Sequence, residues 1–145
     1  MNFWIESVLV TSILSWFLAQ VIKVFLTLMQ KGKLDFRRFV GSGGMPSSHS
    51  SFVTSLAMAV GLKNGFQSTE FAICTVFALV VMYDAAGVRR AAGQQARILN
   101  KMIEDWENSD FSKSDKHLKE LLGHTPKEVF VGALLGIIIA VIRHI

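Results

Sequence analysis

Four apolar stretches separated by polar segments set the pattern of this chain. They run over residues 7–29, 50–62, 71–88 and 129–142. A membrane-spanning helix needs about 20 apolar residues. The first and third stretches are therefore long enough to cross a bilayer on their own, whereas the second and fourth fall short. The pattern predicts an all-α bundle of about four membrane helices, in which the two short helices begin partway into the protein.

A polar section separates the third and fourth apolar stretches, and we predict an amphipathic helical insertion over residues 91–123. Ile98, Met102 and Trp106 recur at intervals of four, which places their side chains on one face of a helix. We expect this insertion to lie along the membrane surface. A solvated cap that packs on the bundle fits the same pattern.

Composition supports a membrane-embedded fold. Among the 145 residues, 51% are apolar and 18% are charged, whereas charged residues make up about 25% of a typical soluble domain. The length suits a single domain over residues 1–145. A soluble bundle of unusually apolar helices remains the alternative.

Positive charge is concentrated in two of the connecting segments. The net charge is +4, and most of the Lys and Arg residues fall in segments 30–49 and 89–127. The positive-inside rule places these two segments in the cytoplasm. A basic face suits phosphates and anionic lipid headgroups. We expect membrane lipids as partners and no nucleic acid, because no nucleic-acid-binding motif accompanies the charge.

The segment from Gly41 to Ser50 carries the first candidate chemistry. It reads Gly-Ser-Gly-Gly-Met-Pro-Ser-Ser-His-Ser and leads into the second apolar stretch. Glycines allow backbone amides to turn toward a ligand, and a helix N-terminus attracts anions. The segment is therefore a candidate phosphate cradle that includes Ser47 and Ser48, with His49 as a proton donor. An ordinary Gly/Ser turn that caps a helix is the alternative.

A second histidine precedes the fourth apolar stretch. His124 lies four residues before Glu128, which is about one helical turn. Glu128 could accept a hydrogen bond from one ring nitrogen of His124 and leave the other nitrogen available to attack. Alternatively, Glu128 simply occupies the first turn of a helix, where negative charge is favourable.

Lys23 lies inside the first apolar stretch. A charge at the centre of a membrane helix costs about 2.5–3.5 kcal/mol on insertion scales, so its side chain should be paired or face a polar cavity. We expect Lys23 to point toward the candidate site. The alternative is that its ammonium reaches the membrane surface along the helix.

Together these motifs resemble the type-2 phosphatidic acid phosphatase superfamily, which includes the vanadium haloperoxidases, and in particular its divergent small bacterial and plastid branch. The pattern Pro-Ser-Gly-His is similar to Pro46-Ser47-Ser48-His49. The closing His-x3-Asp is similar to His124 and Glu128, followed by a glycine-containing apolar helix. The resemblance implies a phosphatase without metal or cofactor, in which His124 attacks phosphorus, His49 protonates the leaving group and Glu128 orients His124.

The resemblance also implies basic phosphate ligands, although the motifs that carry them depart from the family pattern. Lys-x6-Arg-Pro is similar to residues 31–38 followed by Phe39, but Lys23 competes with Lys31 for the role of the lysine, and we expect Lys23 and Arg38 to serve the site. The family's Ser-Arg-x5-His corresponds to Val88-Arg89-Arg90, after which a long insertion precedes His124. The expected phosphate-binding residues are Lys23, Arg38, Ser47, Ser48, Arg89 and Arg90.

The sequence thus predicts a membrane phosphatase that hydrolyses a lipid phosphate or pyrophosphate through a phosphohistidine intermediate. The resemblance implies the bacterial plasma membrane, and the charge distribution places the site on its cytoplasmic face. The alternative is a non-catalytic lipid-phosphate binder or translocase with the same basic site. Gly132 and Gly136 are spaced for close helix packing, either within one chain or in a homo-oligomer.

Overall fold

The computed structural model describes residues 7–31, 44–107 and 123–145. This part of the chain is all-helical, as predicted. The helices are α2 (Val8–Lys31), α3 (Ser48–Asn64), α4 (Thr69–Ala86), α5 (Val88–Glu107) and α6 (Pro126–His144). Helices α2, α3, α4 and α6 coincide with the four apolar stretches.

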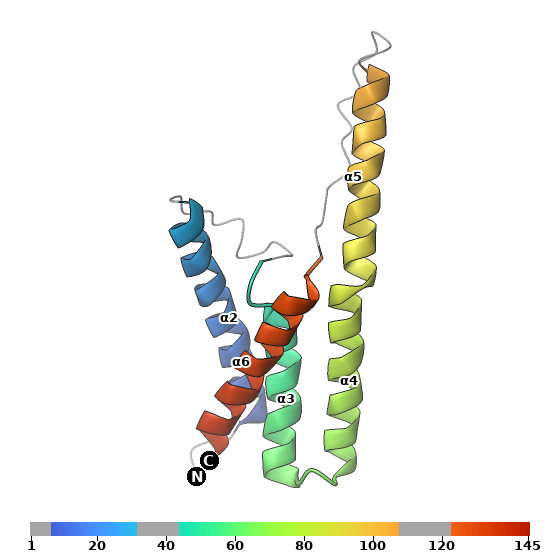
Figure 1. Ribbon diagram of the computed structural model, residues 1–145. Helices are drawn as coiled ribbons and strands as arrows, with labels where there is room; N and C mark the ends of the chain where they lie inside the picture. Colours follow the sequence, from blue (N-terminus) through green and yellow to red (C-terminus); the bar gives the residue numbers. More distant parts are fainter. Residues whose placement is uncertain (1–6, 32–43, 108–122) are drawn as a thin grey trace.

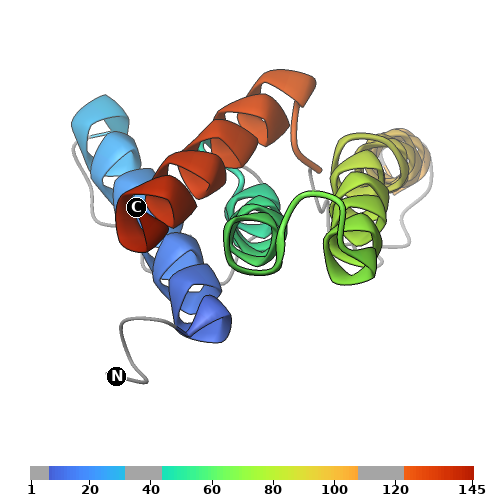
Figure 2. The same cartoon turned by 90° about the horizontal axis from the view of Figure 1, so that it is seen from below.

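Helix α3 lies at the centre of the bundle. Figure 1 shows α2 and α6 on one side of it and α4 on the other, and the view from below in Figure 2 confirms that α3 separates α4 from α2. Helix α3 contacts α2, α4 and α6, whereas α4 and α6 have few contacts with each other. The start of α2 and the end of α6 lie at the lower end of the bundle in Figure 1, whereas the starts of α3 and α6 lie at the upper end.

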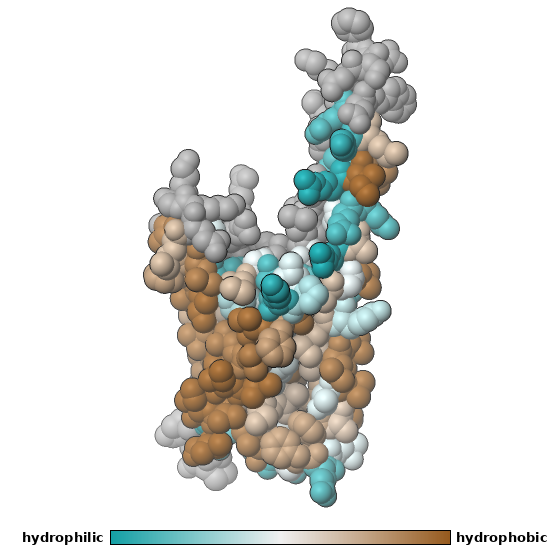
Figure 3. All heavy atoms as spheres, viewed as in Figure 1, coloured by the Kyte–Doolittle hydropathy of each residue, from teal (hydrophilic) through white to brown (hydrophobic). Residues whose placement is uncertain are grey.

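The interior of the bundle is small and polar, and its exterior is large and apolar. Buried positions are mostly Ala, Gly, Ser and Thr, and the described core contains only Ala and Val among the apolar residues. Large apolar side chains such as Phe25, Val80 and Ile138 are more than half exposed. They form the brown belt of Figure 3. This distribution suits helices that pack through small residues and turn their large side chains toward lipid.

Two stretches are long and apolar enough to cross a membrane by length and composition, namely Val8–Met29 and Thr69–Glu104, the second of which contains α4. They correspond to the two stretches that the sequence marked as sufficient. Helix α3 has only 17 residues, and α6 carries Lys127, Glu128 and Arg143 at its ends. The structure therefore supports two candidate spans within the four-helix bundle and does not confirm four.

Hydroxyl groups and glycines bring α2 and α6 close to α3. Ser15 Oγ on α2 lies 2.6 Å from Ser51 Oγ on α3, and Thr54 Oγ1 donates to the carbonyl of Ala133 over 3.0 Å. A Cβ atom on Gly132 would overlap the carbonyl of Ser47, and one on Gly136 would overlap Thr54. The glycine pair thus serves helix packing within the chain, and any homo-oligomer would use another surface.

Helix α5 does not lie across the end of the bundle but continues from α4 beyond it (Figure 1). The reason is local: Gly87 donates its N–H to the carbonyl of Tyr83, and Ala91 donates its N–H to the carbonyl of Gly87, each over 2.9 Å. Helical hydrogen bonding therefore crosses the junction, and no turn redirects the chain onto the membrane surface. Ile98 and Met102, two members of the predicted apolar face, are exposed on α5. The remainder of the predicted insertion, residues 108–122, lies outside the described residues.

Candidate active site

The N-terminus of α3 forms one side of the candidate site. Ser47 is the N-cap, and its hydroxyl accepts hydrogen bonds from Ser50 N over 3.4 Å and from Ser50 Oγ over 3.0 Å. Pro46 therefore lies before the cap and does not form the first turn. Ser47 and Ser48 are buried, and Gly44 has a φ of 89°, a conformation that favours glycine. Residues 41–43 of the predicted cradle lie outside the described part of the chain.

The N-terminus of α6 forms the other side and is held by a capping box. Thr125 is the N-cap: its hydroxyl accepts from Glu128 N over 3.3 Å, and its own N–H donates to Glu128 Oε2 over 3.0 Å. This reciprocal pair satisfies two of the amides that a helix start leaves without partners. The position of the Glu128 carboxylate is thus fixed by the backbone N–H of Thr125.

The same carboxylate oxygen also contacts His124. Glu128 Oε2 lies 3.1 Å from His124 Nδ1, so the two interpretations of Glu128 that the sequence left open hold together. The His124 side chain is almost fully buried. Its Nε2 atom is buried and meets no group of the described structure with full hydrogen-bond geometry, although the Gly44 backbone lies near the ring. Because the carboxylate accepts a proton from Nδ1, the lone pair of the neutral ring lies on Nε2.

A backbone contact joins the two sides. Ser47 N donates to the carbonyl of Glu128 over 3.0 Å, and the close approach at Gly132 allows it. As a result the rings of His49 and His124 lie with their centroids 6.3 Å apart and their planes at 62°. His49 is exposed while His124 is buried, so the pair has one member at the surface and one in the interior.

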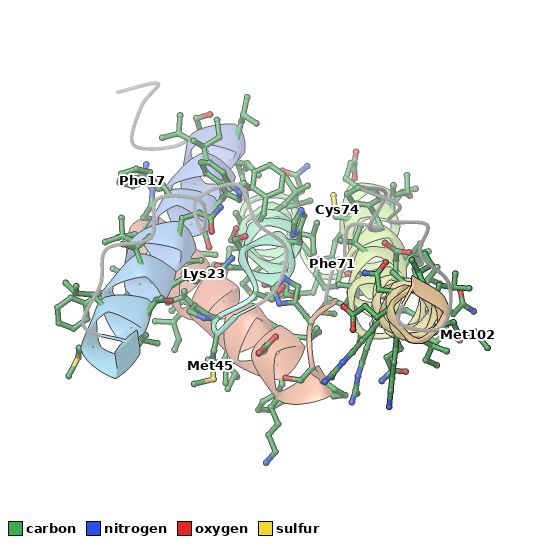
Figure 4. The ribbon with its side chains drawn as sticks, turned by 90° about the horizontal axis from the view of Figure 1, so that it is seen from above. Phe17, Lys23, Met45, Phe71, Cys74 and Met102 are labelled. Carbon is green, nitrogen blue, oxygen red and sulfur yellow. The ribbon has the colours of Figure 1, made fainter. Side chains whose placement is uncertain are left out.

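Lys23 is brought to the same place from α2. Its side chain is only 2% exposed, and Figure 4 shows it pointing from α2 toward the interior of the bundle. Its charge acts on the His124 ring. Lys23 therefore lies in the interior of the bundle, on the side of α2 that faces the other helices. The side chain of the competing residue, Lys31, is not described.

The surroundings of His124 lower its pKa, and this residue lies between helices, outside the spanning segments. Burial is the largest cause, because it disfavours the charged ring. The hydrogen bond with Glu128 raises the pKa and so opposes the effect of burial. The charge of Lys23 lowers the pKa further, whereas the Glu128 charge and the Gly44 backbone raise it. The ring is therefore held neutral at neutral pH, which is the form that can act as a nucleophile.

The remaining predicted phosphate ligands are placed only in part. Arg38 lies outside the described residues, and Arg89 is on α5 with a side chain that is not described. Arg90 is exposed on α5. The backbone of His124, however, lies at the junction of α4 and α5, because His124 N donates to the carbonyl of Ala85 over 3.1 Å. The start of α5 is thus beside the site although its guanidinium groups are not shown to enter it.

Two features of the site were missed from the sequence. The contact between His124 and Ala85 joins segments on either side of the insertion, and no local pattern signals it. The capping box had a signal, since Thr125 and Glu128 have the Ser/Thr-x-x-Glu spacing of that motif. Within residues 7–31, 44–107 and 123–145, no group of three His, Cys, Asp or Glu side chains is arranged to hold a metal ion.

Comparisons with known proteins identify the family of the chain. A family model described as "Divergent PAP2 family" matches residues 4–139. A Bacillus subtilis (strain 168) protein named "Uncharacterized membrane protein YuiD" is 44% identical, over 92% of this chain and 91% of the relative. No solved structure matches the chain. With the family match covering nearly all of the bundle, the chain belongs to the divergent PAP2 family and is a PAP2-related membrane protein.

Proposed function

We propose that this protein is a membrane phosphatase that removes a phosphoryl group from a lipid phosphate or pyrophosphate through a phosphohistidine intermediate. One observation carries the proposal: His124 is buried, its Nδ1 atom is held by Glu128, and its Nε2 atom meets no group of the described structure with full hydrogen-bond geometry. A buried polar atom without a partner is costly in a stable fold. A substrate that approaches Nε2 would supply that partner.

In the first step, the Nε2 lone pair of His124 attacks phosphorus, and the bond between phosphorus and the leaving oxygen breaks. His49 in its protonated form donates a proton to that oxygen, so the lipid alcohol or the lipid monophosphate leaves neutralised by one proton. The Glu128 carboxylate stabilises the positive charge that develops on His124 through the 3.1 Å contact at Nδ1. Lys23 stabilises the negative charge on the phosphoryl oxygens.

In the second step, water attacks the phosphorus of the phosphohistidine. Neutral His49 accepts a proton from this water, the bond between phosphorus and Nε2 breaks, and inorganic phosphate leaves with His124 neutral again. His49 is suited to this exchange because its ring is exposed and close to His124. The two histidines thus return to their starting protonation states, and the net reaction consumes one water.

A lipid substrate is supported by the position of the site. The segments that carry His49 and His124 lie at the upper end of the bundle in Figure 1, where the apolar belt of Figure 3 gives way to polar side chains. A phosphate bound there would sit at headgroup depth, and an attached hydrocarbon chain would lie beside the exposed apolar faces of the helices. A bacterial plasma membrane with the site on the cytoplasmic face is part of the same proposal, on the strength of the charge distribution.

A non-catalytic lipid-phosphate binder or translocase is the second candidate. The observation that favours it is the exposure of Arg90 on α5, because a phosphatase of this type requires cations that hold the phosphoryl group in the transition state. Such a protein would keep Lys23 and the α3 N-terminus as a headgroup site and would not depend on a nucleophile.

The test is phosphate release from a panel of lipid phosphates and pyrophosphates by detergent-purified protein without added metal. Wild type is compared with His124→Asn and His49→Gln, and headgroup binding is measured separately with radiolabelled lipid. Release by wild type that both variants lose, with binding retained, is the expected result. Binding without release in wild type, on every substrate, would favour the binder or translocase.

A further inference from the structure

Thr125 occupies an unusual place for a helix cap. It caps α6, and its cap partner Glu128 is also the residue that contacts His124. Glu128 Oε2 accepts from two donors at once, Thr125 N over 3.0 Å and His124 Nδ1 over 3.1 Å. The Thr125 hydroxyl completes the box by accepting from Glu128 N over 3.3 Å. Thr125 itself is exposed.

In this arrangement, the first turn of α6 holds the Glu128 carboxylate in place. A glutamate side chain has three rotatable bonds, so a single contact with His124 would leave it many conformations. The capping box removes this freedom, because the backbone of Glu128 is fixed by the Thr125 hydroxyl and its carboxylate by the Thr125 N–H. The oxygen that faces His124 is thus placed before any substrate binds.

The alternative is a purely structural role, in which Thr125 only stabilises the start of α6, as N-caps generally do. The structure contains a cap of that simpler kind for comparison. Ser68 caps α4, and its hydroxyl accepts from Phe71 N over 3.2 Å. It lies in the short connection between α3 and α4, at the end of the bundle away from His124 (Figure 1). Ser68 therefore provides a matched control for loss of a cap without loss of the contact at His124.

We propose that Thr125 is a positioning residue: through its capping box with Glu128 it sets which nitrogen of His124 carries the proton, and so keeps Nε2 directed at the substrate as an unprotonated nucleophile. Its effect on turnover rests on the proposed phosphatase function, whereas its effect on the His124 tautomer does not. The two can therefore be tested apart.

The experiment compares Thr125→Val, which removes the accepting hydroxyl, with Thr125→Ser and Thr125→Asn, which retain an N-cap acceptor. Full-length protein in detergent is labelled with 15N-histidine, and the tautomer of His124 is read from its ring nitrogen shifts, with His124→Asn used to assign the signal. We expect the proton to remain on Nδ1 in wild type, Thr125→Ser, Thr125→Asn and the control Ser68→Ala. In Thr125→Val we expect a mixture of tautomers.

Turnover is measured on the same set. Loss of a cap alters a local equilibrium by about tenfold, so we expect kcat to fall about tenfold in Thr125→Val, with little change in KM and recovery in the Ser and Asn variants. An unchanged tautomer in folded Thr125→Val, or an equal loss in Ser68→Ala, overturns the proposal. If Thr125→Val does not fold, Thr125→Ala replaces it with the same expectation. Absence of turnover in wild type would overturn the phosphatase function, and the tautomer measurement would still decide the role of Thr125.

Discussion

His124 donates its backbone N–H to the carbonyl of Ala85 over 3.1 Å, although the whole 91–123 insertion separates the two residues. Ala85 lies one helical turn before Arg89. The backbone one turn before Arg89 and the backbone of His124, which the insertion separates in the sequence, therefore lie next to each other in the fold. The largest departure of this chain from the superfamily pattern thus leaves the backbone of the site together.

Replacement of Glu128 tests the support of the nucleophile. Glu128→Gln keeps an oxygen that can accept from Thr125 N and from His124 but removes the charge that stabilises the protonated ring. A hydrogen bond to a charged group contributes about 1.5–3 kcal/mol, so kcat should fall roughly 10- to 100-fold. Glu128→Asp, which restores the residue type of the superfamily motif, should retain more activity. Steady-state kinetics on a lipid phosphate checks this, and full activity in Glu128→Gln would refute the electrostatic role.

Lys23 should be required for catalysis. Lys23→Met removes the cation near the phosphoryl group, so kcat/KM should fall roughly 10- to 100-fold. Thermal unfolding in detergent is measured alongside, so that the loss of activity is read from folded protein. The matched control is Lys63→Met, since Lys63 is exposed at the far end of α3. Equal activity in both variants would remove Lys23 from the site.

Replacement of His49 should slow the reaction more when the leaving group is poorer. His49→Gln should lower the rate about 10²- to 10⁴-fold on an alkyl phosphate, which leaves as an alcohol and needs a proton. The loss should be small on a nitrophenyl phosphate, whose leaving group is stable as an anion. His144→Gln serves as the control, because His144 bonds to Thr11 at the C-terminal end of α6. A uniform loss on both substrates would argue against general-acid catalysis by His49.

The lowered pKa of His124 gives a pH dependence of defined sign. Activity should rise with pH as His124 loses its proton, with an apparent pKa below the ordinary value of 6.5. Lys23→Met should move this limb to higher pH, because the Lys23 charge lowers the pKa of His124. A pH-rate profile of wild type and variant measures both positions, and an acidic limb at or above 6.5 in wild type would contradict the burial of a neutral ring.

The free energy of unfolding should also depend on pH through the protonation of His124. The folded protein binds the His124 proton more weakly than the unfolded chain, so the unfolded state holds more protons between the two pKa values. Stability is therefore fully present above the unfolded pKa of about 6.5 and is lost as pH falls toward the folded pKa. Thermal unfolding of wild type and His124→Asn across this window gives the comparison, and the variant should lose less stability on acidification.

Gly132 should be required for the close approach of α6 to the start of α3, which brings His49 and His124 together. An alanine Cβ there would overlap the Ser47 carbonyl, and overpacking of this kind typically costs about 1–3 kcal/mol. Gly132→Ala should lower both stability and the activity of the folded fraction. Gly61→Ala is the control, because its Cβ would meet the rings of Phe66 and Phe71 away from the site. It should lower stability alone.

The helices could be predicted from the sequence because each apolar stretch is continuous and is bounded by Gly, Pro or charged residues. The direction of α5 could not, because it depends on whether helical hydrogen bonds cross Gly87, and an amphipathic pattern is equally compatible with a surface helix. The inward packing of Gly132 and Gly136 was also left open. Small-residue spacing permits close approach of helices but does not select the partner helix.

Within the site, the local relationship of His124 and Glu128 could be predicted from their spacing alone. The burial of Lys23 could not be predicted from the sequence, since it depends on which face of α2 turns toward the other helices. The sequence analysis treated the place of Glu128 in the first helical turn and its orienting role as competing explanations. They coexist because one carboxylate oxygen accepts from both Thr125 N and His124 Nδ1, a geometry that spacing cannot reveal.

The most direct test of the account is to trap the phosphoryl group on the enzyme. Wild type is mixed with a radiolabelled lipid phosphate, quenched rapidly in alkali, which preserves phosphohistidine, and mapped by mass spectrometry. The account predicts a phosphoryl group on Nε2 of His124 that is absent in His124→Asn. Turnover that persists in His124→Asn, or a phosphoryl group on another residue, would contradict it.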